Sequence, residues 1–342
     1  MSYKPGAAVA SRQSSTGMIG VMKRIRVYEF GAPEVLRLEE APDPQPAAGQ
    51  VLVRIKAAGV NPYDTYMRAG AYGAGNPQLP FTPGSDAGGI IEALGADVSG
   101  LAVGERVYTA STLTGAYAEL ALCNRDAVQP LPEPVSYSEA AALHVPYGTA
   151  FRALFQVARA TLGQTVLVHG ASGGVGLAAV QFARTAGLTI IGTAGSEEGL
   201  RLIRAQGVDH AINHRDAEHG REVLRITGGR GVDVILEMLA NVNLGKDLPL
   251  LANGGRVVVV GSRGTVEINP RDLMSRGASV TGMMLGALST EERSQVYRAI
   301  DVGLRSGALR PIIGLELPLV DAPEAHRRVL QPGARGKIVL IP

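Results

Sequence analysis

The stretch Val166–Arg184, VLVHGASGGVGLAAVQFAR, decides the fold of this chain. A short apolar strand, Thr165–His169, runs into a glycine-rich turn, and a helix of small residues follows. Gly173 and Gly176 stand where a dinucleotide-binding turn needs close approach to a pyrophosphate and tight packing of helix on strand. Free N–H groups at the helix start then face the phosphates, and Ser172 adds a hydroxyl donor. The alternative is a tight turn that merely needs flexible glycines; the strand before and the helix after favour dinucleotide binding.

Strand and helix patterns alternate on both sides of this turn. The runs TVLVHG, LTIIGTAG, VDVILEML and GGRVVVVGS are rich in Val and Ile, with helical segments between them. Such continuous apolar strands predict a parallel sheet covered on both faces. Residues 23–143 instead show short strands with frequent turns, such as the alternating QVLVRIKAAGV of residues 50–60. This pattern predicts a mostly antiparallel β domain, to which IIGLELPL and GKIVLI near the C-terminus return as strands.

The expected architecture is therefore α/β, with a doubly wound parallel sheet inserted in an antiparallel β domain. We expect residues 23–146 and 288–342 to form the β domain and residues 147–287 to bind the dinucleotide. Residues 1–22 lack the continuous apolar core of a signal peptide, so we expect a flexible extension.

Composition excludes several classes of function. The 342 residues carry a net charge of +2, only 4% aromatic residues and no Trp, which disfavours a dedicated nucleic-acid surface. No apolar run is long enough to span a bilayer. A single cysteine, Cys123, excludes an intramolecular disulfide and any site built from several thiolates. These features predict a soluble cytoplasmic protein.

The tip of the second strand of the alternating region favours NADPH over NADH. An NAD site usually has an acidic residue there to bind the ribose 2′-hydroxyl. This chain has Gly195 and Ser196 instead, and Ser196 as N-cap would place Glu197 and Glu198 in the first turn of a helix. The tip thus leaves room for a 2′-phosphate, with three possible donors nearby: Arg201, His214 and Arg215.

The β domain lacks the residues of a zinc dehydrogenase. Such enzymes carry Cys where Asn61 stands and His-Glu where Ser85-Asp86 stand, and the single cysteine cannot supply a four-thiolate lobe. We therefore expect no metal. Candidates to line the catalytic cleft are Asn61, Asp64 and Tyr66, although Asn-Pro and Asp also start turns for purely structural reasons.

The chain resembles the quinone oxidoreductase/ζ-crystallin family of medium-chain dehydrogenases. Its signature spacing is matched by Gly163-Gln164, Leu167, Ala171–Gly174, Gly176, Gln181 and Arg184. Further similar segments include GVNPYDTYMRAG, TPGSDAGGIIEALG, EMLANVNL and GGRVVVVGSRGTVEINPRD. The resemblance implies a GroES-like catalytic domain, a Rossmann domain, a homo-oligomer (dimer or tetramer) and zinc-free, NADPH-dependent reduction of quinones, often by single electrons and with a preference for ortho-quinones.

The resemblance also implies a set of site residues. Tyr66 would approach the nicotinamide, and Gly195 and His214 would flank the adenine ribose phosphate. The other cofactor contacts would be Ser172, Gly173, Gly174, Val175, Asn243, Val260, Gly261, Ser262, Arg263, Met283, Met284 and Leu285. One departure concerns Gly199, which stands where bacterial members often carry a lysine. Phosphate selectivity must therefore use other groups.

Two other functions stay open at this point. The same hydride could reduce the double bond of an enone or a 2-alkenal, because the acceptor is set by the cleft and not by the cofactor loop. Relatives of ζ-crystallin also serve as lens proteins and bind RNA, although the balanced charge disfavours a dedicated RNA-binding role.

Overall fold

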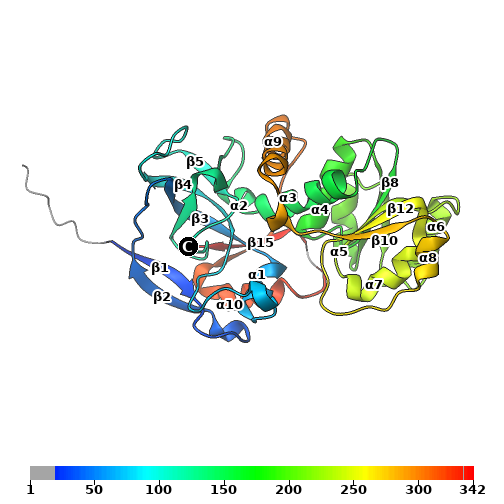
Figure 1. The fold of residues 1–342 in the computed structure, drawn as a ribbon, viewed down its shortest axis with the longest axis horizontal. Helices are drawn as coiled ribbons and strands as arrows, with labels where there is room; N and C mark the ends of the chain where they lie inside the picture. Colours follow the sequence, from blue (N-terminus) through cyan, green and yellow to red (C-terminus); the bar gives the residue numbers. More distant parts are fainter. Residues whose placement is uncertain (1–19, 334) are drawn as a thin grey trace, which may run out of the picture.

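The computed structural model describes residues 20–333 and 335–342 (Figure 1). Residues 1–19 of the predicted extension lie outside these ranges. Its last two residues, Val21 and Met22, are not an extension, because they begin strand β1 (Val21–Arg26). Met22 is buried in a hydrophobic cluster with Leu52 and Leu120, which holds this end of β1 against the β domain. Among the described helices, none combines the length and the apolarity that crossing a membrane would require.

The first sheet confirms the predicted antiparallel β domain. Its strands follow the order β14-β15-β3-β4-β5-β7, with β6 also paired to β3. Every pair is antiparallel except β14 with β15. A separate hairpin joins β1 to β2 (Arg37–Pro42). The strands of the sheet are β3 (Gln50–Val60), β4 (Asp86–Leu94), β5 (Arg106–Thr109), β6 (Leu120–Asn124), β7 (Val128–Pro130), β14 (Ile313–Pro318) and β15 (Lys337–Ile341).

The second sheet confirms the predicted doubly wound parallel sheet. Its six strands are parallel throughout and follow the order β10-β9-β8-β11-β12-β13. Counted from β8, this is the order 3-2-1-4-5-6 of a Rossmann sheet, which binds its ligand where the order reverses, between β8 and β11. The strands are β8 (Thr165–Val168), β9 (Thr189–Ala194), β10 (His210–Asn213), β11 (Val232–Glu237), β12 (Leu251–Val259) and β13 (Ser279–Gly282).

Helices cover both sheets and connect them (Figure 1). The α-helices are α1 (Pro62–Arg68), α2 (Tyr137–Ala140), α3 (His144–Phe151), α4 (Gly174–Thr185), α5 (Glu197–Ala205), α6 (His219–Ile226), α7 (Ala240–Asp247), α8 (Pro270–Met274), α9 (Thr290–Ser306) and α10 (Ala322–Arg328). A π-helical segment, Arg152–Val157, continues α3. Short 3-10 helices lie at Pro33–Val35, Gly73–Gly75, Arg125–Ala127, Leu248–Leu250, Leu285–Ala287 and Leu319–Asp321.

The parallel sheet buries side chains on both faces, as its continuous apolar strands predict. In β8, Val166 and Val168 pack in one hydrophobic cluster with residues of α4 and α9. Leu167 points to the opposite face and joins a second cluster with Leu244 of α7. Because side chains alternate along a strand, a strand between two helical layers must be apolar at every position.

The two lobes are joined by the last strand of the chain. The N–H of Gly336 donates to the backbone oxygen of Ser172 over 2.8 Å, in the glycine-rich turn of the parallel sheet. One residue later the chain enters β15, which lies between β14 and β3 in the other sheet. In Figure 1 β15 accordingly runs from the junction of the lobes into the β domain.

Candidate active site

The glycine-rich turn between β8 and α4 has the geometry of a phosphate-binding loop. Gly170 takes a left-handed conformation, with φ +57°. A Cβ on Gly176 would lie 2.4 Å from the oxygen of Gly170, so only glycine allows helix and strand to approach this closely. Helix α4 begins after Gly173 without a side-chain cap, which leaves the N–H groups of its first turn available to an anion.

The tip of β9 lies beside this turn and carries the predicted 2′-phosphate contacts. Ser196 caps α5, as predicted, with Oγ accepting from the N–H of Gly199 over 3.1 Å. A Cβ on Gly195 would meet Nε2 of His214 at 2.6 Å and Nε of Arg215 at 3.2 Å, so both side chains lie against the tip. Arg201 lies instead 3.6 Å from Glu198, with which it forms an exposed ion pair.

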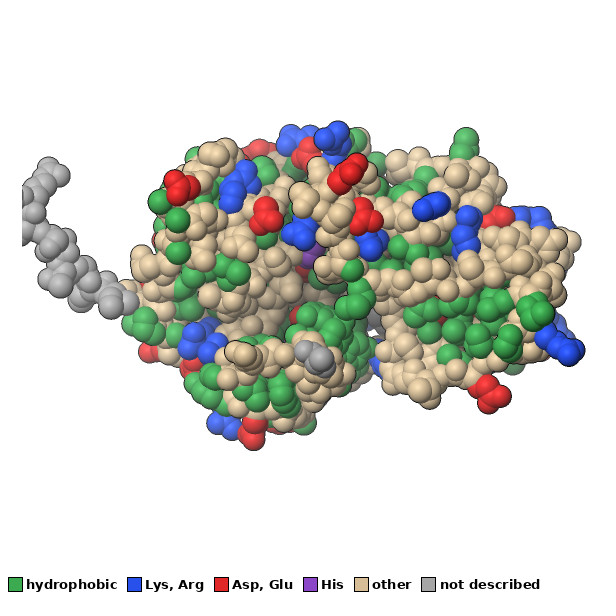
Figure 2. Space-filling model, viewed as in Figure 1, with side chains coloured by type: hydrophobic (Ala, Val, Ile, Leu, Met, Phe, Trp, Pro, Cys, Tyr) green, Lys and Arg blue, Asp and Glu red, His purple; other side chains and the backbone are tan. Residues whose placement is uncertain are grey.

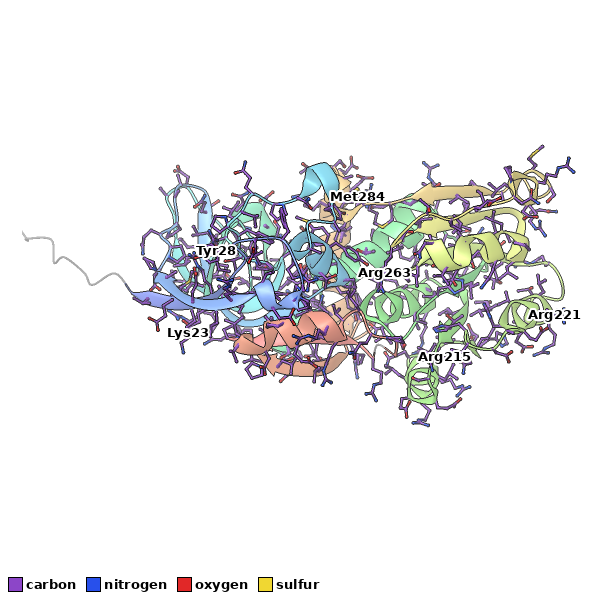
Figure 3. All side chains as sticks on the ribbon, turned by 90° about the horizontal axis from the view of Figure 1, so that it is seen from below. Lys23, Tyr28, Arg215, Arg221, Arg263 and Met284 are labelled. Atoms are coloured by element: carbon purple, nitrogen blue, oxygen red, sulfur yellow. The ribbon has the colours of Figure 1, made fainter. Side chains whose placement is uncertain are left out.

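His214 and Arg215 offer different chemistry at this tip. Burial lowers the pKa of His214, and the nearby charges of His169, His219 and Arg215 lower it further. The imidazole is therefore neutral at physiological pH and acts as a hydrogen-bonding group. The guanidinium of Arg215 supplies the permanent positive charge that a phosphate monoester prefers. Figure 3 labels Arg215 at the lower edge of the parallel-sheet lobe, nearer to the junction of the lobes than Arg221.

A buried charged group lies at the reversal point of the parallel sheet. His169 follows β8, Glu237 ends β11, and Asp247 ends α7; all three side chains are almost completely buried. Nε2 of His169 lies 2.7 Å from Oδ1 of Asp247 and 3.6 Å from Oε2 of Glu237. The remaining oxygens, Glu237 Oε2 and Asp247 Oδ2, have no hydrogen-bond partner among the described residues. This group was not predicted from the sequence. The acidic residue that ends the apolar run VDVILE is the feature that could have indicated a buried charge.

The protonation of this group follows from its burial. Burial raises the pKa of Glu237 to about 7, and Asp247 raises it further while His169 opposes the shift. Burial alone would lower the pKa of His169, but the hydrogen bond to Asp247 and the two carboxylate charges raise it overall. Each of the three side chains offers one ligand atom within 4.8 Å of the others, a spacing that a metal ion could also use. That the chain binds no metal remains a prediction.

Glu237 also holds several of the predicted cofactor contacts in place. Its Oε1 accepts from the N–H of Leu239 and, over 3.2 Å, from Nδ2 of Asn243. Its backbone oxygen accepts from the N–H groups of Val260, over 2.8 Å, and Gly261, over 3.2 Å. Glu237 thus holds three predicted contacts: Asn243 through its carboxyl group, and Val260 and Gly261 through its backbone oxygen.

Asn61 and Asp64 form the buried base of α1 in the other lobe. The junction between the two lobes, where Tyr66 of α1 meets Arg263, is called the cleft below. Asn61 caps the helix, and its N–H donates to Oδ2 of Asp64 over 2.8 Å. Oδ2 of Asp64 also accepts from the hydroxyl of Tyr117 over 3.1 Å. The exposed fractions of Asn61 and Asp64 are only 3% and 2%. Of the three predicted catalytic residues, only Tyr66 is partly exposed. Asn61 and Asp64 are buried, and their hydrogen bond holds the start of α1 in place.

Lys337 lies beside Asn61 and Asp86, which stand at positions where zinc dehydrogenases carry Cys and His-Glu. Its Nζ donates to Oδ1 of Asn61 over 2.5 Å and to Oδ2 of Asp86 over 2.8 Å. Nδ2 of Asn61 donates to the same Asp86 oxygen over 3.0 Å, which closes a buried triangle. Lys337 was not predicted as a site residue. A single basic residue at the start of the apolar strand GKIVLI is the feature that could have indicated a buried charge.

The remaining predicted contacts line the mouth of the cleft. Arg263 Nε donates to the hydroxyl of Tyr66 over 3.2 Å, and the N–H of Arg263 donates to Oδ1 of Asn241 over 2.8 Å. Ser262 Oγ is turned toward its own loop, where it donates to the oxygen of Gly264. Met284 is 56% exposed, and Figure 3 shows it near Arg263 between the lobes.

Met283 and Leu285 lie on the inner side of this segment. Met283 packs against the cluster around α4. Leu285 lies against α3, where a Cβ on Gly148 would be 3.1 Å from its Cδ1. Ser172 is buried, and a Cβ on Gly199 would come within 3.3 Å of its Oγ. The structure therefore brings the predicted contacts to one edge of the parallel sheet, while the role of each remains a prediction.

Two family models match this chain. The model described as alcohol dehydrogenase GroES-like domain matches residues 47–133. The model described as zinc-binding dehydrogenase matches residues 174–302. The two matches fall on the antiparallel and the parallel sheet in turn, so they support the division of the chain into two lobes.

Full-length relatives are also similar to this chain. The quinone oxidoreductase of Homo sapiens is 48% identical over 323 residues, which cover 94% of this chain and 98% of the relative. The structure of mycobacterial Rv1454c complexed with NADPH has a TM-score of 0.86 and 32% identity, over 94% of this chain and 100% of the other. Escherichia coli quinone oxidoreductase complexed with NADPH has a TM-score of 0.85 and 30% identity, with the same coverage.

Replacing Lys337 should show how strongly the protein is destabilised when the buried Asp86 carboxylate has no counter-ion. We expect Lys337→Met to lower the free energy of unfolding by about 3–5 kcal/mol, because the variant leaves a buried charge without its partner. Adding Asp86→Asn should recover part of this loss, as measured by urea unfolding. A double variant whose loss equals the sum of the two single losses would contradict the assignment.

Replacing Glu237 should change how stability depends on pH. Because the folded pKa of Glu237 is raised from 4.5 to about 7, its contribution to stability is complete below pH 4.5 and is lost as the pH rises toward 7. The raised pKa of His169 acts in the same direction. We expect Glu237→Gln, which stays neutral, to weaken the decline in unfolding free energy between about pH 5 and pH 8. An equally steep decline in the variant would show that Glu237 is not its source.

Proposed function

The chain belongs to the quinone oxidoreductase family, and from this membership we propose that it is an NADPH-dependent quinone reductase. The observation that carries the proposal is the full-length identity of 48% to a quinone oxidoreductase. The same fold in two quinone oxidoreductase-type structures that contain NADPH supports the cofactor. We further propose ortho-quinones as preferred acceptors and the cytoplasm as location. We also propose the domain boundaries given above, at residues 146/147 and 287/288.

The residues of the cleft fit NADPH. The uncapped first turn of α4 would receive the pyrophosphate, and Gly176 allows the close packing that this requires. At the tip of β9, the absence of an acidic side chain and the approach of Arg215 fit a ribose 2′-phosphate. NADPH supplies a hydride when bound; the protein holds and orients it against the acceptor.

The β domain holds Tyr66 in position at the cleft. Asn61, Asp64 and Lys337 keep α1 fixed, so that Tyr66 is presented to the cleft from a rigid base. Tyr66 and Arg263 then supply hydrogen-bond donors at the mouth. No protein nucleophile is needed for this reaction, because the reducing equivalents come from the cofactor.

We also propose that the chain forms a homo-oligomer through the edge of its parallel sheet. In the described part of the chain, β13 pairs only with β12, and its outer edge is open. Figure 2 shows hydrophobic side chains on the surface of this lobe. Its exposed large apolar side chains include Val242, Val266, Met274 and Met284. A second copy pairing along β13 would cover such an edge. A monomer at every concentration in sedimentation velocity would contradict this.

The proposed activity is tested by steady-state kinetics. Purified protein is assayed with NADPH and NADH against ortho-quinones, para-quinones, enones and 2-alkenals. We expect NADPH oxidation with quinones and a preference for ortho-quinones. Consumption with enones but not with quinones would overturn the proposal in favour of a double-bond reductase. The RNA-binding alternative is tested separately by filter binding over a series of salt concentrations.

The NADPH preference should depend on Arg215. We expect Arg215→Gln to reduce the ratio of kcat/KM for NADPH to that for NADH by about tenfold, because a charged hydrogen bond to the 2′-phosphate is lost. Arg221→Gln is the matched control: Arg221 is an exposed arginine of the same lobe, paired with Glu218. An unchanged ratio in Arg215→Gln would place phosphate recognition elsewhere.

A further inference from the structure

Two side chains from opposite lobes, Arg263 and Tyr66, meet at the mouth of the cleft. They are 197 positions apart in the sequence, yet Nε of Arg263 donates to the hydroxyl oxygen of Tyr66 over 3.2 Å. Both side chains are at least partly exposed, so the pair borders solvent and not the core. Figure 3 shows Arg263 between the lobes and not on the outer surface.

This contact leaves several donors free. The guanidinium has five N–H groups, and Nε uses one of them. Its Nη1 and Nη2 atoms form no hydrogen bond with the described residues. Since the Tyr66 oxygen accepts from Nε, the hydrogen of its hydroxyl remains free to donate. Together the two side chains present a permanent positive charge and converging N–H and O–H groups to the cleft.

The backbone segments that carry both side chains are held in place by hydrogen bonds. Tyr66 belongs to α1, whose cap Asn61 is tied to the buried Lys337. The backbone N–H of Arg263 donates to Asn241, at the start of α7. Donors that are held in place before the substrate arrives stabilise a developing charge without first having to reorganise.

We infer that Arg263, together with Tyr66, binds the quinone oxygen that gains negative charge during reduction, and that Arg263 is thus a catalytic residue. The inference rests on the proposed quinone reductase activity. When the quinone is reduced to a hydroquinone, the hydride brings two electrons and one proton, and the second proton comes from water. When it is reduced by single electrons, the two electrons of one NADPH pass to two quinones, which become two semiquinone anions, and one proton is released to water. In both courses a quinone oxygen is an anion until it is protonated, and the guanidinium and the hydroxyl stabilise it.

The same geometry gives Arg263 a part in acceptor choice. In an ortho-quinone the two oxygens are on adjacent carbons, so the planar guanidinium and the neighbouring hydroxyl reach both. In a para-quinone the oxygens are on opposite sides of the ring, and the pair reaches only one. Loss of Arg263 therefore lowers activity with ortho-quinones more than with para-quinones.

The kinetic test compares Arg263→Gln, Tyr66→Phe and the double variant. We expect each single variant to lower kcat/KM for an ortho-quinone by about 10- to 100-fold. The double variant should be little worse than either single variant, because the two hydrogen-bonded side chains act as one unit on the same developing negative charge. The Kd for NADPH, from fluorescence titration, should rise much less than kcat/KM falls, although both residues are also predicted cofactor contacts. Arg263→Lys keeps the charge but loses the planar fork, so it should fall between wild type and Arg263→Gln.

A binding measurement tests the anion contact without turnover. Nitrocatechol is an ortho-diphenol whose visible absorbance reports its ionisation, and it is titrated into the protein with NADP⁺ present. Wild type should bind it as the anion at a pH below its ionisation in water, and Arg263→Gln should lose this shift. Arg221→Gln, at the far end of the lobe in Figure 3, is the control and should keep it.

The outcomes separate the inference from the proposed function. If wild type reduces quinones while Arg263→Gln keeps its kcat/KM within about threefold and its nitrocatechol shift, the inference alone is overturned. A change confined to the Kd for NADPH would also overturn it, because it would make Arg263 a cofactor contact only. If wild type reduces no quinone at all, the proposed function fails, and the inference fails with it.

Discussion

The structure depends on the contact of Gly336 and Lys337 with both lobes at once. The N–H of Gly336 donates to Ser172 in the glycine-rich turn between β8 and α4, and the next residue places its ammonium between Asn61 and Asp86. Two consecutive residues thus fix the distance between the loop and the base of α1. A hydride is transferred only over a short distance, so this local constraint sets the geometry on which the whole cleft relies.

The protein keeps its buried charges in two places, and they act differently. The Lys337–Asp86 pair is a complete ion pair whose hydrogen bonds are satisfied by Asn61. The His169–Asp247–Glu237 group contains two carboxyl groups for one imidazole, so one carboxyl must be neutral to avoid an unpaired charge. The first arrangement lies within the β domain, where it fixes the start of α1, and the second fixes Leu239 and Asn243 through Glu237. Both groups are buried, and each holds residues that lie nearer the surface.

The sequence predicted the elements that local pattern determines. The period of the apolar residues gave both sheets, and the strand–turn–helix context of Gly173 and Gly176 gave the loop. It could not predict contacts between distant segments, such as Lys337 with Asp86, because pairing across about 250 residues leaves no periodic signal. Nor could it assign Gln181, a residue of the family signature: the structure shows it buried, bonded to Tyr147, Gln206 and Arg310. Its place is structural, which a motif alone does not distinguish from a ligand contact.

The position of β15 has a consequence for synthesis of the protein on the ribosome. The parallel sheet is built from one continuous stretch, residues 165–282, and all its strands are translated before β15. The β domain begins earlier in the chain but contains β15, residues 337–341, as an inner strand between β14 and β3. Until residues 337–341 leave the exit tunnel, β3 lacks one of its neighbours and Asp86 lacks its counter-ion. The domain that is translated first is therefore completed last, reversing the usual N-to-C order of domain folding.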